Sequence, residues 1–295
     1  MRTVQTIAAC REAVRTARSR GQTIRFVPTM GALHEGHVSL VRQAVADGGF
    51  VVVSIFVNPT QFNSASDLAA YPQTLDTDLR LCRDAGCDLL LAPSAEQMYP
   101  DGSTLGYAGQ TQVRVPALGH GLCGRFRPGH FDGVAGVVAK LLNITQADVL
   151  YMGAKDFQQA AIVGRMLLDL NFAVELVLCE TVREPDGLAM SSRNARLSPA
   201  GRSIAPALYA GLCAAAEQLR SRGDAASAVR AGCSRIEAVP GIELEYFEIC
   251  DPATLEPLSP QLQPAPGARA LIAVAAVVEQ VRLIDNVVVQ IPRNG

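Results

Sequence analysis

Short apolar runs alternate with longer amphipathic stretches as far as about Leu178, and this alternation limits the fold more than any other feature of the sequence. Apolar runs of four to eight residues are typical of strands buried on both faces, whereas the stretches between them have the spacing of amphipathic helices. Alternating strands and helices favour a parallel sheet covered by helices on both faces. The expected strands are 24–27, 50–57, 88–91 and 147–152, and the expected helices are 37–45, 75–85, 134–142 and 158–168.

The pattern changes after Arg193 to alanine-rich helical sequence followed by β-type runs. We expect helices over 199–220 and 225–238, strands over 244–250, 271–278 and 280–289, and an exposed loop rich in Pro, Gly and Ala over 261–269. The sequence therefore predicts a Rossmann-like parallel-sheet nucleotide-binding domain over residues 1–181. A smaller α+β C-terminal domain, a candidate lid, is predicted over residues 182–295.

The composition is that of an ordinary globular protein, with 295 residues of which 49% are hydrophobic. A formal net charge of −2 gives no general attraction to nucleic acid or to an anionic membrane, so neither is an expected partner. The longest apolar runs are too short to span a bilayer, and the arginine-rich stretch 2–20 favours a surface helix over a transit peptide. Eight scattered cysteines without a Cys-x-x-Cys pair indicate reduced thiols and a cytoplasmic location.

Two of the four histidines lie where the strand 24–27 is expected to pass into a helix that ends near Gly48. A helix N-terminus gathers free backbone N–H groups and about half a positive charge, so an anion is stabilised there. Gly36 leaves room for a phosphate, and the imidazoles of His34 and His37, at i and i+3, can touch it. A zinc site is the weaker alternative, because no cysteine pair at ligand spacing supplies the remaining ligands.

Other cationic and hydroxyl side chains stand in similar segments. Among the basic residues, 24 are arginine and only two, Lys140 and Lys155, are lysine. Lys155 follows Gly153 at a second strand-to-helix junction, where a compact ammonium suits a phosphate, although drift in an arginine-favouring chain is the alternative. The loop 125–133, which contains Arg127, suits an anionic ligand, and a solvated basic loop is the alternative. The hydroxyls and guanidinium of the segment 190–194 could bind a triphosphate.

A polar turn, Asn58 to Phe62, follows the strand 50–57 at the edge where open α/β sheets bind ligands. Gln61 could present its amide to a small polar substrate, or it could serve only as a turn residue. Asp76 and Asp78 could hold magnesium, but both also have the position of ordinary acids in the first turn of a helix.

Five segments taken together, 30–37, 58–62, 127–131, 153–159 and 190–194, resemble the pantothenate synthetase (pantoate–β-alanine ligase) family along nearly the whole chain. A His-x-Gly-His motif alone would indicate only the wider nucleotidyltransferase superfamily, whereas its combination with Asn-Pro-Thr-Gln-Phe and Met-Ser-Ser-Arg-Asn is specific. The resemblance implies an AMP-forming, Rossmann-like ligase that joins pantoate to β-alanine through a pantoyl adenylate. It further implies ATP and Mg²⁺ as cofactors and a cytoplasmic homodimer.

The resemblance also implies roles for individual residues. His37, His34, Lys155 and Arg193 would be catalytic, Gln61 and Gln159 would bind pantoate, and Asp78 would be the magnesium-side carboxylate. Arg127 and Lys140 would belong to the same basic pocket. The residues implied in ATP binding are Met30, Gly31, Ala32, Leu33, His34, Glu35, Gly36, His37, Gly153, Ala154, Lys155, Asp156, Val182, Met190, Ser191, Ser192 and Arg193.

Ala154 stands where the family usually has glutamate, which puts any contact of that side chain in doubt. Two other functions remain open. A nucleotidyltransferase would move AMP onto a phosphate-bearing acceptor without ligation. A nucleotide-sensing protein that has lost catalysis is the second, against which the retained histidines and lysines argue.

Overall fold

The computed structural model describes residues 1–102, 111–222, 224–258 and 267–291, which form two compact units. The first comprises Met1–Gly119, Phe126–Ala154 and Ile162–Glu180, and the second comprises His120–Arg125, Lys155–Ala161 and Thr181–Gly295. Two short segments that precede Thr181 in the sequence thus belong to the second unit. The domain boundary at residue 181 and the lid role stay predictions, and most of the loop expected over 261–269 lies outside the described residues.

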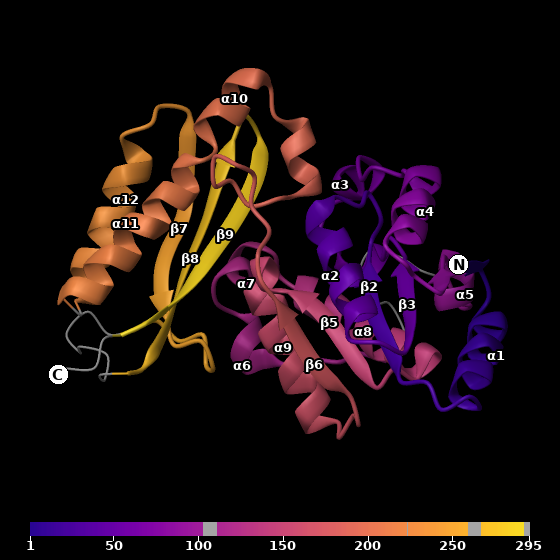
Figure 1. Ribbon diagram of the computed structural model, residues 1–295. Helices are drawn as coiled ribbons and strands as arrows, with labels where there is room; N and C mark the ends of the chain where they lie inside the picture. The colour runs from indigo at the N-terminus through magenta and orange to yellow at the C-terminus, as the bar shows by residue number, and fades with distance from the viewer. Residues whose placement is uncertain (103–110, 223, 259–266, 292–295) are drawn as a thin grey trace. The chain divides into compact units, whose positions relative to one another are not determined.

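A six-stranded parallel sheet forms the centre of the first unit, as the alternating sequence predicted (Figure 1). Its strand order is β1-β4-β3-β2-β5-β6, so the order reverses between β2 and β5. Ligands of open α/β sheets bind outside the carboxyl ends of the strands at such a reversal. The strands are β1 (Arg2–Val4), β2 (Ile24–Thr29), β3 (Phe50–Ile55), β4 (Leu89–Leu91), β5 (Val149–Gly153) and β6 (Glu175–Cys179).

Helices cover both faces of this sheet. Val27 and Val53 share a core with apolar residues of α2 and α4, while Phe26 and Val52, which point to the opposite face, are completely buried where α1 and α8 pack. The edge strands β1 and β6 were not predicted: β1 has only three residues, and the apolar run of β6, residues 176–179, is as short as a strand signal can be. The helices are α1 (Ile7–Arg18), α2 (Glu35–Ala46), α3 (Ala65–Ala69), α4 (Leu75–Asp84), α5 (Ala95–Met98), α6 (Pro116–Gly119), α8 (His130–Thr145) and most of α9 (Phe157–Asp169), with the 3₁₀ turn η1 (Pro59–Gln61).

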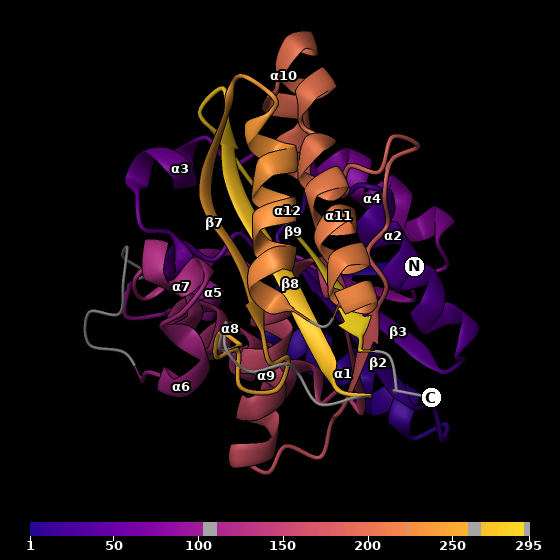
Figure 2. The ribbon, with the colours of Figure 1, turned by 90° about the vertical axis from the view of Figure 1, so that its left-hand side faces the viewer.

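The second unit has an antiparallel sheet of β7 (Ile242–Cys250), β8 (Arg269–Val278) and β9 (Val281–Gln290). Helices α11 (Ala207–Arg222) and α12 (Ala225–Glu237) lie side by side on one face of it (Figure 2). The single helix expected over 199–220 is wrong. It is two helices, α10 (Pro199–Ile204) and α11, because Pro206 lacks the N–H group that a continuous helix needs there. The remaining elements are α7 (Cys123–Phe126), η2 (Ala154–Asp156) and η3 (Ser192–Arg196).

Among the residues that the structure describes, no helix is long and apolar enough to cross a membrane. All eight cysteines are free thiols, as expected for a chain whose cysteines are scattered.

Candidate active site

The loops that follow β2 and β5 leave neighbouring strands at the point where the strand order reverses. The first of these loops runs from Met30 to His34 and enters α2, and the second begins at Gly153 and Ala154 and enters α9 through a 3₁₀ turn. Both glycine-bearing motifs were predicted to lie at strand-to-helix junctions, and the structure confirms both junctions. This edge of the sheet is where an open α/β fold offers helix N-termini to an anion.

His34 and His37 cap the N-terminus of α2 reciprocally. His34 is the N-cap residue, and its Nδ1 accepts a hydrogen bond from the Gly36 N–H at 3.2 Å. The His37 Nδ1 accepts one from the His34 N–H at 3.4 Å, and the two ring centroids lie 4.1 Å apart. The sequence predicted unoccupied N–H groups at this helix N-terminus. The structure modifies this expectation, because the His34 imidazole already accepts the Gly36 N–H.

The capping geometry fixes the tautomer of both rings. A ring nitrogen that accepts a backbone N–H carries no proton, so the proton of each neutral imidazole is assigned to Nε2. An N–H group at Nε2 donates to an oxygen without requiring a positive charge on the ring. Both rings are half-buried, and a neutral imidazole N–H is the kind of donor that a phosphate oxygen accepts.

Asp78 holds the loop between β2 and α2. Gly31 and Ala32 both have left-handed backbone conformations, with φ of 82° and 49°. Such a turn points successive N–H groups at one place and forms a small anion site. The Asp78 carboxylate fills it, accepting from the Ala32 N–H at 3.0 Å and from the Leu33 N–H at 2.8 Å. The carboxylate therefore fixes the path of the predicted nucleotide loop.

These contacts decide whether Asp78 suits a magnesium ion. Its side chain is 1% exposed, and its two oxygens also accept the Thr74 hydroxyl at 3.2 and 3.3 Å. Mg²⁺ needs open octahedral geometry and usually keeps several waters. In the described part of the chain, no three His, Cys, Asp or Glu side chains cluster in a way that could hold a metal. The residues present do not fit a protein-held magnesium site at Asp78.

Gln61 lies in a buried polar turn that the sequence analysis placed correctly at the end of β3. The side chain is 7% exposed; its Oε1 accepts from Asn58 Nδ2 at 3.2 Å, and its Nε2 contacts the Met30 sulfur at 2.8 Å. Asn58 Oδ1 in turn accepts from the Tyr99 hydroxyl at 2.8 Å. Burial raises the pKa of Tyr99, so its hydroxyl stays a donor at neutral pH. Gln61 and Met30 are thus brought into direct contact.

His130 supports the same turn, a role that the sequence analysis did not assign. Its Nδ1 donates to the Gln61 carbonyl at 2.7 Å, and its Nε2 accepts from Arg127 at 3.2 Å. The Asn58 amide also donates to the Gly133 carbonyl at 3.1 Å, so the turn is tied to α8. In the sequence, the glycine and histidine residues within the basic loop 125–133 were the signal that could have indicated this role of His130. Lys140, further along α8, is exposed and lies over the Tyr99 ring at 4.9 Å.

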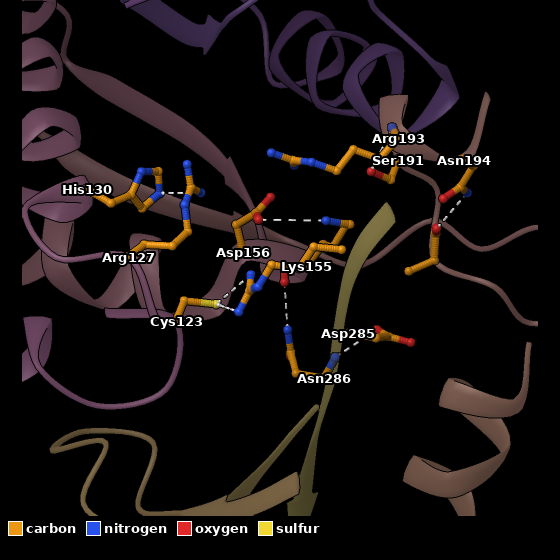
Figure 3. Close-up of polar contacts among 12 residues, drawn as sticks. Cys123, Arg127, His130, Lys155, Asp156, Ser191, Arg193, Asn194, Asp285 and Asn286 are labelled. Carbon is orange, nitrogen blue, oxygen red and sulfur yellow. Dashed lines mark hydrogen bonds and ion pairs between the residues drawn. The ribbon is translucent and has the colours of Figure 1, made fainter. Parts of the chain in front are cut away.

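In the second unit, Lys155 is held through its main chain. Its carbonyl accepts from Asn286 Nδ2 at 2.8 Å, and its ammonium lies 3.7 Å from the Asp156 carboxylate (Figure 3). The Lys155 side chain is 17% exposed, so the ammonium is partly open to a ligand. Gln159, one turn further on, is half-buried.

The segment from Val182 to Asn194 forms a hairpin that returns on itself. Met190 N–H donates to the Val182 carbonyl at 3.0 Å, and Ser191 caps the turn η3 by accepting from the Arg193 N–H at 3.2 Å. Asn194 donates to Glu184 and to the Ala189 carbonyl, which closes the hairpin. The hydroxyls of Ser191 and Ser192 and the guanidinium of Arg193 are therefore carried by one short, internally bonded segment.

The fold of the first unit defines a Rossmann-like α/β protein with an imidazole-capped helix at the strand reversal, a class suited to nucleotide phosphates. The pantoate–β-alanine ligase family model matches residues 2–288. The chain belongs to this family.

Relatives and solved structures agree with the match. A pantothenate synthetase of Pseudomonas fluorescens (strain Pf0-1) is 47% identical over 287 residues, which cover 97% of each chain. The pantothenate synthetase structure from Thermus thermophilus is 46% identical, with a TM-score of 0.88 over 97% of this chain and 99% of that one. The Francisella tularensis pantoate–β-alanine ligase, complexed with β,γ-ATP and β-alanine, is 33% identical with a TM-score of 0.76, covering 97% of each chain.

Proposed function

We propose that the chain condenses pantoate with β-alanine in an ATP-dependent reaction that passes through a pantoyl adenylate and releases AMP and pyrophosphate. One observation carries the proposal: in a chain of this ligase family, the loops after β2 and β5 flank the strand reversal, and the first leads into a helix capped by His34 and His37. The solved relative with β,γ-ATP and β-alanine supports the same substrates.

In the first step, an oxygen of the pantoate carboxylate attacks the α-phosphorus of ATP, and the bond from that phosphorus to the bridging oxygen breaks. Negative charge grows on the phosphate oxygens as pyrophosphate leaves. The Nε2–H groups of His34 and His37 donate to these oxygens, and the ammonium of Lys155 and the guanidinium of Arg193 offset the charge. Groups held in place before the reaction stabilise such charge at little reorganisation cost.

In the second step, the amine of β-alanine attacks the acyl carbon, loses a proton and displaces AMP. Gln61 and Gln159 orient pantoate through their amides, which the buried contacts of Gln61 support. Orientation of two bound reactants supplies much of the acceleration in such a transfer. ATP is bound by residues 30–37, by Gly153 to Asp156, by Val182, and by Met190 to Arg193.

Three further properties belong to the proposal. Mg²⁺ bound with ATP would supply positive charge to the phosphates, and the contacts of Asp78 leave this carboxylate unsuited as its direct ligand. The free thiols support a cytoplasmic location. A homodimer follows from the family resemblance alone, and sedimentation velocity tests it, since a monomer at micromolar concentration would contradict it.

Isotope exchange tests the reaction route. With pantoate and ATP but no β-alanine, we expect labelled pyrophosphate to appear in ATP, because adenylation is reversible before the amine arrives. With ¹⁸O in the pantoate carboxylate, one labelled oxygen should appear in AMP after full turnover. ADP and phosphate as products would indicate an acyl-phosphate route, and products without free AMP would indicate a nucleotidyltransferase.

Single substitutions test the assigned donors. His37→Ala and Lys155→Ala should each lower turnover by on the order of 10²- to 10³-fold, as when one preorganised charge-stabilising donor is removed. The measurement is the steady-state rate at saturating substrates. His120→Ala is the matched control, because His120 is an exposed histidine 3.9 Å from the Glu256 carboxylate and has no assigned role in the reaction. Near-normal rates in both variants would refute these assignments.

A further inference from the structure

Two adjacent residues of β9, Asp285 and Asn286, bond to the two segments of the second unit that carry the proposed phosphate-binding groups. Successive side chains of a strand point to opposite faces of its sheet. Asp285 bonds to Arg183 in the hairpin 182–194, and Asn286 bonds to the main chain of Lys155. Figure 3 shows the Asn286 side chain directed at Lys155. One strand thus connects both segments.

Asp285 occupies a position that the packing of the sheet would otherwise fill with an apolar side chain. Leu283 and Val287, its neighbours on the same face, belong to the core beneath α11 and α12. The Asp285 side chain is 2% exposed, and a buried carboxylate is costly unless it is fully paired. A leucine or valine at this position would contribute packing alone. The carboxylate therefore indicates that residue 285 has to hold another group in place.

Arg183 satisfies that carboxylate in a two-pronged pair. Its guanidinium donates to Asp285 at 2.6 and 3.0 Å, to the Asn286 carbonyl at 3.2 Å and to the Gly187 carbonyl at 3.1 Å. The same group stacks on the Tyr209 ring at 3.8 Å. A planar guanidinium bonded in this way has a single orientation. The base of the hairpin is therefore fixed to β9.

Asn286 fixes the other segment. Its amide donates to the Lys155 carbonyl at 2.8 Å, and Asn286 is 7% exposed. The Asn286 N–H donates to the Asp285 carboxylate at 2.7 Å, so the two contacts share one stretch of backbone. A shift of β9 would move Lys155 and the hairpin together.

We propose that Asp285 and Asn286 are positioning residues, which hold Lys155 in register with Ser191, Ser192 and Arg193 for the phosphates of ATP. The inference rests on the proposed function. Neither residue needs to touch substrate, and each acts through the group that it holds.

A double-mutant cycle with Lys155 tests the Asn286 contact. Asn286→Ala should lower the rate of pantoate-dependent ATP–pyrophosphate exchange about tenfold, as for a lost buried hydrogen bond, with the KM for pantoate unchanged. In the Lys155→Ala background the same substitution should change the rate by less than about twofold, because the ammonium whose position it sets is absent. An equal loss in both backgrounds would overturn the proposal.

Matched variants separate positioning from stability. Val288→Ala, two residues along the same face of β9, removes a half-buried side chain and keeps the Asn286 amide that donates to Lys155. It should leave exchange unchanged at a comparable loss of stability in urea. Asn286→Asp keeps the size of the side chain but opposes a carboxylate to the Lys155 carbonyl, and should be at least as slow as Asn286→Ala. If Val288→Ala slows exchange equally, Asn286 contributes stability alone.

Asp285→Asn tests the hairpin. It should raise the KM for ATP several-fold while the KM for pantoate is unchanged, because the pairing that orients Arg183 loses its charge. An unchanged KM for ATP in a folded variant would remove Asp285 from the proposal. Absence of exchange in the unsubstituted protein would instead refute the proposed function, so the two failures are distinguishable.

Discussion

At the scale of single residues, His34, His37 and Asp78 fix the loop that leads from β2 into α2. His34 and His37 were predicted as phosphate contacts from their spacing, and the structure adds that each Nδ1 is occupied by a backbone N–H. Asp78 shows the limit more clearly. Its place in the first turn of a helix was predicted, but its acceptance of two N–H groups from residues 46 and 45 positions earlier was not, because no local pattern records so distant a contact.

Asp78→Asn should lower the free energy of unfolding by about 1–3 kcal/mol. In asparagine an NH₂ group replaces one of the two oxygens that accept from the Ala32 and Leu33 N–H groups, so one of these hydrogen bonds is lost. Urea titration measures this loss, and the KM for ATP should rise as the loop loosens. The dependence of the rate on Mg²⁺ concentration should not change. Asp76→Asn is the control, since Asp76 is exposed in the same turn of α4. An increased Mg²⁺ requirement with unchanged stability would make Asp78 a metal ligand instead.

At the scale of elements, periodicity located the central strands and the long helices, whereas edge strands and helix breaks were missed. The approach of α8 to the turn η1 illustrates what periodicity omits. A Cβ added to Gly133 would lie 2.6 Å from the Gln61 Cα and 2.7 Å from the Thr60 carbonyl oxygen. Glycine is required there because the backbone of α8 contacts the backbone of η1. The spacing of apolar residues in the helix does not show this requirement, because it is compatible with alanine at the same position.

Gly133→Ala should therefore destabilise the protein by roughly 1–3 kcal/mol, the usual cost of overpacking. It should also raise the KM for pantoate, since the displaced backbone carries Gln61. Thermal unfolding and steady-state kinetics measure the two effects. Gly119→Ala is the matched control, because a Cβ there meets nothing within 4 Å. Equal behaviour of the two variants would mean that α8 and the turn can separate without consequence.

At the scale of the whole molecule, the distribution of thiols follows the cores of the two units. Of eight free cysteines, only Cys213 is exposed, and five are buried. Burial raises the pKa of Cys82, Cys87 and Cys250 to about 12, so their thiolate fraction at pH 8 is on the order of 10⁻⁴. We therefore expect thiol reagents to react with only a few of the eight cysteines in the folded protein.

In the native protein at pH 8, a disulfide reagent should modify Cys213 rapidly, the half-buried Cys179 and Cys233 slowly, and the five buried thiols only on unfolding. Absorbance of the released thiol counts each class, and denaturant should bring the total to eight. Cys213→Ser should abolish the fast phase. A fast phase that survives this substitution would show that a core opens on the timescale of the reaction.

Local sequence was enough to predict the parallel α/β sheet, the second α+β segment, the two strand-to-helix junctions with their histidines and lysine, and the family. Each of these follows from residues that are close together in the sequence, because the apolar positions of helices and strands recur every few residues and a motif is a contiguous segment. Three features depend instead on how the chain packs: Asp78 fills the turn before α2, His130 holds Gln61, and β9 bonds to both Lys155 and Arg183. These contacts join residues tens to more than a hundred positions apart, and their partners are selected by packing rather than by any repeat along the chain.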